Sequence, residues 1–281
     1  MYRIILALLL LIPQITEARQ QQSLLLIDAT TKSVIVSQDP GVVRSIASIT
    51  KLVTAIVAYE HYSLDTELVV SGQLVGKIFN NTATVDQLIT TLIIKSDNNA
   101  AETLAENYAG GRVAFIRSMN YKAQQLGLHN TVFADPTGLG VMNRSTAYEV
   151  ASIMNYIMTV PKLSEVVGLR QATIVVQKKK NKSKTTTITN TNHALMSKHN
   201  SIVGSKTGFT NQAGWCVTIA VEEKGQRFIA VVLGTRGPAD RNNQAEKLIK
   251  KIPTVVQIRR SPDLAYNNST PSVAPFPAQR R

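Results

Sequence analysis

The chain has 281 residues, and 44% of them are hydrophobic, enough to bury the core of one large domain or two subdomains. Its formal net charge of +13 indicates anionic surroundings such as nucleic acid, lipid head groups or an acidic wall polymer, or it serves solubility alone. The single cysteine, Cys216, excludes an intrachain disulfide and a thiol pair for a metal. It lies in an apolar run, so we expect a small buried side chain.

Residues 1–18 have the pattern of a secretory signal peptide. Arg3 supplies a short positive start, residues 4–13 form an apolar run too short to span a bilayer, and Ala18 ends a small-residue cleavage site. No other stretch of the sequence approaches transmembrane length. We therefore expect an exported protein of the periplasm or another extracytoplasmic space, with no transmembrane anchor after cleavage and no nucleic-acid partner.

Strands are predicted first along the mature chain, and helices follow them. Residues 23–29 and 33–37 are predicted to form a hairpin around a Thr-Thr-Lys turn. Residues 48–62 are predicted to form an amphipathic helix, because apolar side chains recur there at helical spacing. Further helical patterns cover residues 84–94, which Thr84 and Gln87 open as a possible capping box, and residues 99–108, 112–126 and 146–158.

Beyond Pro161 the pattern returns to strands. Residues 172–177 and 185–189 predict a hairpin whose lysine-rich tip, 178–184, is either a solvated turn or a contact for an anionic polymer. The chain then continues with predicted strands 214–221 and 227–235, a closing helix 239–252 and a disordered basic tail 253–281.

Strands at both ends of the chain and helices in its middle predict an α+β fold. The economical arrangement is an antiparallel sheet built from residues 20–62 and 170–252, flanked by helices, with a mostly helical insert at 63–169. The folded domain is expected to cover residues 19–252. A groove between the sheet and the insert is the natural place for a site.

Ser48 and Lys51 form the first candidate motif, because they stand one turn apart on the same face of a predicted helix. A buried amine that is held neutral can take the proton of such a serine, which is the requirement for an activated nucleophile. About one S-x-x-K is expected by chance in a chain of this length. A helix cap beside a solvated lysine is therefore the plainer interpretation of this motif alone.

Two later motifs favour the activated nucleophile over the helix cap. Ser96-Asp97-Asn98 lies between two helical patterns, where a hydroxyl can relay a proton and an amide can bind a lysine, although all three residues also suit helix capping. Lys206-Thr207-Gly208 precedes a strong strand. Its glycine would admit a peptide alongside the sheet and its polar side chains could hold a carboxylate, although a turn with a solvated lysine has the same pattern.

Together the motifs S-x-x-K, S-x-N and K-T-G occur in an order typical of penicillin-interacting serine enzymes. The chain resembles the penicilloyl-serine transferases, especially the small serine-type D-alanyl-D-alanine peptidases, over roughly 23–252. The matching contexts are residues 46–55, 96–101, 133–139 and 206–210. Asn190-Thr191-Asn192, upstream of the lysine, is similar to the endopeptidase branch, also called the penicillin-binding protein 7/8 type.

The resemblance implies a penicillin-binding/β-lactamase-like fold and a reaction on peptidoglycan peptides. Ser48 would be acylated at the carbonyl between two D-alanines or at a cross-link, with Lys51 as the base. Ser96 would pass the proton to the leaving amine, and Asn98 would orient Lys51 and the substrate. No metal or cofactor is implied, and β-lactams are implied as covalent inhibitors.

The resemblance also implies how the substrate is held. Lys206 and Thr207 would bind its carboxylate end, and the backbone N–H groups of Ser48 and Phe209 would form the oxyanion hole. Arg236 ends a predicted strand that the antiparallel arrangement places beside Lys206, so it is a further candidate to face the carboxylate, although a solvated arginine has the same pattern.

Two alternatives remain. A serine β-lactamase would share the fold, but the E-x-x-L-N pattern of the class A enzymes is missing, and Arg170 replaces the asparagine in the nearest match at Glu165. A non-catalytic wall-binding protein would use the charge, yet it has no need of the complete set of motifs. The tail has no apolar helical stripe of the kind that anchors the larger carboxypeptidases, which favours the endopeptidase branch.

Overall fold

The computed structural model describes residues 22–70, 82–178 and 182–253, with only the backbone described at 176–178 and 182–184. The predicted signal segment therefore lies outside the described residues, as does the predicted tail after Pro253. No helix within the described ranges has both the length and the apolar character needed to cross a membrane.

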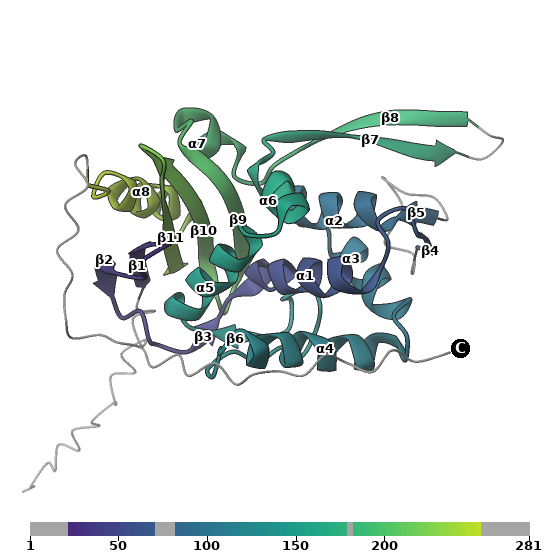
Figure 1. Cartoon of the computed structure of the whole chain (residues 1–281), viewed down its shortest axis with the longest axis horizontal. Helices are drawn as coiled ribbons and strands as arrows, with labels where there is room; N and C mark the ends of the chain where they lie inside the picture. The colour runs from purple at the N-terminus through teal and green to yellow at the C-terminus, as the bar shows by residue number, and fades with distance from the viewer. Residues whose placement is uncertain (1–21, 71–81, 179–181, 254–281) are drawn as a thin grey trace, which may run out of the picture.

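A five-stranded antiparallel sheet lies on the left in Figure 1, beside most of the helices. Its strands are β1 (Ser23–Asp28), β2 (Val34–Gln38), β9 (Ile202–Thr210), β10 (Gly214–Glu223) and β11 (Gln226–Thr235), in the spatial order β2-β1-β11-β10-β9. Strand β1 pairs with β11, so that Ser23 lies opposite Leu233. This confirms the prediction that both ends of the chain build one sheet.

Helices cover both faces of this sheet, and others form the insert that the sequence predicted. They are α1 (Lys51–His61), α2 (Val85–Ile94), α3 (Asn98–Glu106), α4 (Gly111–Gln125), α5 (Ala147–Ile157), α6 (Pro161–Gly168), α7 (His193–Lys198) and α8 (Pro238–Ile249). Because strand side chains alternate between faces, Leu25 joins the core under α1 and α5, whereas Leu26 joins the smaller core under α7 and α8.

Three further strand pairs complete the fold. They are β3 (Arg44–Ser45) with β6 (Arg144–Ser145), β4 (Glu67–Val69) with β5 (Thr82–Thr84), and β7 (Gln171–Lys178) with β8 (Lys182–Thr189). The β7–β8 ribbon confirms the predicted hairpin. It extends above α2 (Figure 1), where Gln87 Nε2 donates a hydrogen bond to the Val175 carbonyl at 2.9 Å.

The local signals explain several of these boundaries. Thr84 and Gln87 form the predicted capping box at the start of α2. The helix predicted from Ser48 begins as a 3-10 turn, η1 (Ala47–Thr50), and becomes α-helical only at Lys51. Helix α6 was not predicted, although Pro161 at its first position is a typical helix start.

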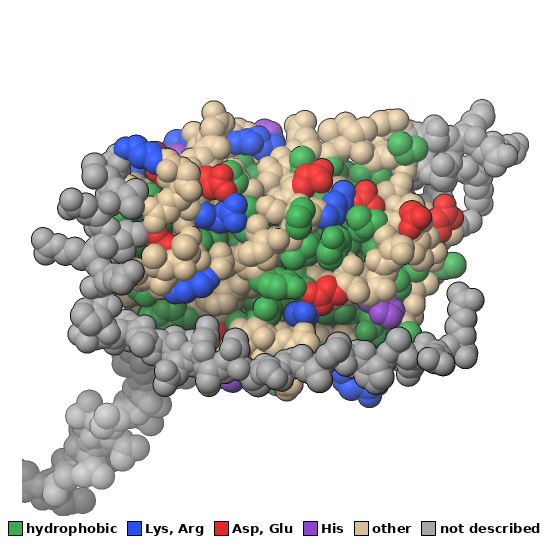
Figure 2. Space-filling view, in the orientation of Figure 1, with side chains coloured by type: hydrophobic (Ala, Val, Ile, Leu, Met, Phe, Trp, Pro, Cys, Tyr) green, Lys and Arg blue, Asp and Glu red, His purple; other side chains and the backbone are tan. Residues whose placement is uncertain are grey.

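Lys and Arg side chains lie interspersed with Asp and Glu over the described residues of the face in Figure 2.

Candidate active site

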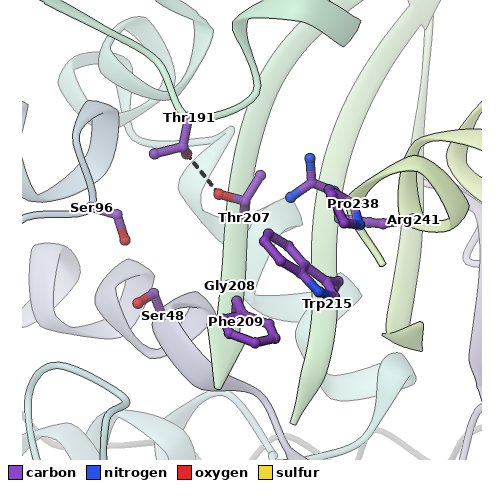
Figure 3. A pocket seen from close by; sticks show the side chains of 9 residues that line it. All are labelled: Ser48, Ser96, Thr191, Thr207, Gly208, Phe209, Trp215, Pro238 and Arg241. Carbon is purple, nitrogen blue, oxygen red and sulfur yellow. Dashed lines mark hydrogen bonds between the residues drawn. The ribbon is translucent and has the colours of Figure 1, made fainter. Parts of the chain in front are cut away.

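A cleft of about 370 Å³ lies between the edge strand β9 and the helical insert (Figure 3). Its lining residues come from η1, the loop after α2, the segment after β8, strands β9 and β10, and helix α8. They are Ser48, Ser96, Thr191, Thr207, Gly208, Phe209, Trp215, Pro238 and Arg241. The cleft therefore lies where the sequence analysis expected a groove.

Ser48 is held in a strained and closely packed segment. The preceding residue, Ala47, has a φ of 47°, in the left-handed region that side chains other than glycine rarely adopt. A Cβ atom at Gly208 would lie 2.9 Å from the Ser48 nitrogen, so glycine is required there for β9 to approach η1. Backbone strain of this kind is typical of functional sites.

Lys51 is fully buried directly behind Ser48. Its Nζ lies 3.0 Å from Ser48 Oγ, 2.7 Å from Asn98 Oδ1 and 2.6 Å from the Thr137 carbonyl oxygen. Burial lowers the pKa of Lys51 to about 7, against the opposing effect of nearby carboxylates, chiefly that of Asp135. A serine beside an amine that is half neutral at pH 7 is a nucleophile–base pair.

The carbonyl that binds Lys51 belongs to a loop organised by Asp135. Asp135 Oδ1 accepts hydrogen bonds from Thr137 N, Thr137 Oγ1 and Gly138 N, and its Oδ2 accepts one from Gly140 N. Gly138 has a φ of 79°, and a Cβ atom there would lie 2.0 Å from the Ala47 carbonyl oxygen. The loop is therefore pressed against the segment that carries Ser48.

The loop between α2 and α3 supplies the wall of the cleft that faces β9. Ser96 has a φ of 58°, a second strained residue at the site. Asp97 caps α3 by accepting hydrogen bonds from the backbone nitrogens of Asn99 and Ala100. Capping therefore accounts for Asp97, while Ser96 lines the cleft and Asn98 binds Lys51.

Lys206 is also fully buried, and it joins β9 to the Ser96 loop. Its Nζ donates to Ser96 Oγ at 2.8 Å and to the Thr207 carbonyl at 3.0 Å. Burial, together with the positive charges of Lys51 and Arg241, holds the pKa of Lys206 well below its usual range. Two buried amines thus approach the cleft from opposite sides, each bonded to a different serine.

The outer part of the cleft is both aromatic and basic. The Phe209 and Trp215 rings stack with centroids 4.2 Å apart. The Arg241 guanidinium lies 5.9 Å from the centroid of the Trp215 ring. The Thr207 hydroxyl is hydrogen-bonded to that of Thr191 at 2.6 Å. This part of the cleft offers hydroxyl and guanidinium groups suited to a carboxylate.

The structure brings together seven of the eight residues predicted for the site. Four of them line the cleft, namely Ser48, Ser96, Thr207 and Phe209. The other three are hydrogen-bonded to lining residues or to each other: Lys51 bonds Ser48 and Asn98, and Lys206 bonds Ser96. The eighth, Arg236, is exposed in the turn after β11 and is not part of the lining.

The predicted position of Arg236 beside Lys206 is wrong, because β10 lies between β11 and β9. Its role in binding stays a prediction. Sequence reasoning missed Trp215, Pro238 and Arg241 as lining residues and gave Thr191 no role. Arg241 follows on α8, only a short way beyond Arg236, but recognising it requires knowledge of how α8 packs on the sheet.

Comparisons with known proteins found a matching family model and similar proteins. A family model of D-alanyl-D-alanine carboxypeptidases, peptidase family S11, matches residues 13–237. A D-alanyl-D-alanine endopeptidase of Escherichia coli (strain K12) is 33% identical over 224 residues, covering 76% of this chain and 71% of that protein. A D-alanyl-D-alanine endopeptidase of Pseudomonas aeruginosa is 34% identical over 225 residues, with coverages of 76% and 71%.

Solved structures are also similar. The Streptomyces K15 DD-transpeptidase matches with a TM-score of 0.77 and 27% identity, over 83% of this chain and 96% of that chain. The cefotaxime-bound penicillin-binding protein D2 from Listeria monocytogenes matches with a TM-score of 0.71 and 26% identity, over 83% and 96% of the two chains.

Proposed function

Because the chain belongs to the family of D-alanyl-D-alanine carboxypeptidases, peptidase family S11, we propose that Ser48 is the nucleophile of a D-alanyl-D-alanine endopeptidase. The protein is a serine D-alanyl-D-alanine peptidase by family. Preference for cross-links over free peptide ends is supported by the endopeptidase names of the 33% and 34% identical relatives. An extracytoplasmic location is part of this proposal, and it is supported by membership of a family of exported cell-wall enzymes.

The hydrogen bonds of Lys51 carry this proposal. A neutral lysine amine has two N–H bonds and one lone pair. The Asn98 and Thr137 oxygens can only accept, so they take both N–H bonds, at 2.7 and 2.6 Å. The lone pair is then directed at Ser48 Oγ, 3.0 Å away, and can receive the serine proton.

Acylation follows from this arrangement. Ser48 Oγ attacks the carbonyl carbon of a D-alanyl residue, and its proton moves to Lys51. The backbone N–H groups of Ser48 and Phe209 hold the oxyanion. When the C–N bond breaks, the Ser96 hydroxyl passes a proton to the leaving amine and recovers one from Lys51. Water then hydrolyses the ester and frees the enzyme.

The substrate is held along the edge of the sheet. An extended peptide beside β9, the edge strand next to the cleft, would place the residue after the scissile bond toward the outer cleft. Its carboxylate is bound there by the Thr207 hydroxyl, with Arg241 and the buried amine of Lys206 close by. A β-lactam presents a carboxylate in the same relation to its reactive carbonyl, so it acylates the same serine.

Digestion of purified cross-linked peptidoglycan tests this function. We expect loss of cross-linked dimers with matching gain of monomers, detected by chromatography and mass spectrometry. Ser48→Ala should abolish the activity, whereas Ser152→Ala, which removes an exposed hydroxyl on α5, should not. Release of terminal D-alanine without cleavage of dimers would make the protein a carboxypeptidase instead. Rapid turnover of a chromogenic cephalosporin would favour a β-lactamase.

A further inference from the structure

A pair of threonines forms the part of the cleft where the substrate carboxylate is proposed to bind. Thr191 and Thr207 both line the cleft, and their hydroxyl oxygens lie 2.6 Å apart (Figure 3). Thr207 lies on β9 and is buried, whereas Thr191 is exposed at the rim. The two residues approach each other from different segments, so their contact depends on how those segments pack.

Thr191 is held firmly despite its exposure. Its backbone nitrogen donates to the Ile94 carbonyl at the end of α2. On one side, Asn190 is buried and donates through Nδ2 to the Leu169 carbonyl. On the other side, Asn192 is buried and donates through Nδ2 to Ser205 Oγ on β9. Two buried asparagines thus fix the position from which the Thr191 hydroxyl meets Thr207.

The direction of this hydrogen bond decides what Thr207 can offer to a ligand. A hydroxyl has one proton to donate. If Thr207 donated to Thr191, it would present only lone pairs to a carboxylate and would repel it. If Thr191 donates instead, the Thr207 proton is free for the carboxylate, and a chain of two bonds in one direction strengthens both.

We propose that Thr191 is a positioning residue for carboxylate recognition: it donates its hydroxyl proton to Thr207, which in turn donates to the substrate carboxylate. The inference rests on the proposed function, because it takes the bound group to be the carboxylate of a peptide cleaved at Ser48. Thr191 acts through Thr207 and sets selectivity for an anionic over a neutral residue after the scissile bond.

Two substrates and three variants test this role. The substrates are a D-alanyl peptide whose leaving residue, as in a cross-link, carries a free α-carboxylate, and the same peptide with that carboxylate converted to a carboxamide. Thr191→Val, which keeps the shape but removes the hydroxyl, should raise KM for the carboxylate about fivefold with little change in kcat. Selectivity for carboxylate over carboxamide, measured as a ratio of kcat/KM, should fall by the same factor. Thr191→Ser should restore it, and Thr187→Val, an exposed threonine on β8, should leave it unchanged.

A double-mutant cycle separates this role from direct contact with substrate. In a Thr207→Val background, adding Thr191→Val should have no further effect on selectivity. An additive effect, or equal losses on both substrates, would overturn the proposal, as would unchanged kinetics in a Thr191→Val protein of normal melting temperature. If the wild type releases no product from either peptide and Ser48 is never acylated, the proposed function fails and not the threonine pair alone.

Discussion

Replacing Gly138 by alanine should separate the precision of the site from the stability of the fold. A Cβ atom at Gly138 would lie 2.0 Å from the Ala47 carbonyl oxygen and 2.8 Å from Thr50 Oγ1. A carbon and an oxygen need roughly 3.3 Å, so either the 135–140 loop or the Ser48 segment must move by about 1 Å. Either movement disturbs the contact between Thr137 and Lys51.

Gly138→Ala should lower both the stability of the fold and the rate of acylation. A non-glycine residue at a φ of 79° costs about 1–2 kcal/mol, and the overpacking adds about 1–3 kcal/mol. A misplacement of about 1 Å at a reacting group can cost about 100-fold in rate. We therefore expect Gly138→Ala to be destabilised by about 2–5 kcal/mol and to be acylated by penicillin about 100-fold more slowly.

Gly127 provides the matched control. It has a φ of 70°, close to that of Gly138, but a Cβ atom there would meet nothing within 4 Å. Gly127→Ala should therefore lose stability through backbone strain alone and keep its acylation rate. Stability is measured by denaturant unfolding. The acylation rate is measured by labelling with fluorescent penicillin, with the reaction quenched at a series of times. A folded Gly138→Ala protein that is labelled as fast as the wild type would refute the reasoning.

Other perturbations probe the base, the nucleophile, the basic side chains and the tail. With the pKa of Lys51 at about 7 and the neutral amine as the base, the acylation rate should be half-maximal near pH 7 and fall to about one hundredth at pH 5; a flat profile from pH 5 to 9 would exclude Lys51 as the base. Ser48→Ala should fold normally but take no penicillin label, and label that persists, or maps to Ser96, would place the nucleophile elsewhere. Arg241→Ala should raise KM for a carboxylate-ended peptide about tenfold and Arg236→Ala less than twofold, because Arg241 lines the cleft and Arg236 does not. A larger rise in KM for Arg236→Ala than for Arg241→Ala would favour Arg236. Truncation after Ile252 should leave the melting temperature and peptidase rate nearly unchanged, and loss of folding would show that the tail docks.

The sequence was most informative where function and local chemistry coincide. Ser48, Ser96 and Lys206 could be grouped from the sequence alone, because each belongs to a short motif whose residue types serve one reaction. The sheet from both termini could also be predicted, since strand-like patterns gather at the two ends of the chain and helical ones between them. Apolar side chains at helical spacing and the capping box at Thr84 indicated helices between those ends.

The remaining features depend on packing between segments that are distant in sequence. Strand order placed β10 between β11 and β9, and this brought Arg241 to the cleft in place of Arg236. No local pattern predicts a left-handed φ at Ala47 or Ser96, since both residues avoid that region unless their surroundings impose it. The hydroxyl contact of Thr191 likewise arises only when the segment after β8 packs against the end of α2 and against β9.

The pairing of β1 with β11 also determines when the site can exist. The helices of the insert make contacts that are close in sequence, whereas β1 must wait for the last strand before it has a partner on that side. Closing so long a loop makes this pairing a late step, and folds dominated by such contacts are slow to form. Lys51 follows β1 in the chain and Lys206 lies on β9, so we expect the two buried amines to face each other across the cleft only after that step. A chain caught before it would expose unpaired strand edges and would not react with penicillin, so the recovery of labelling during refolding should follow the slowest kinetic phase.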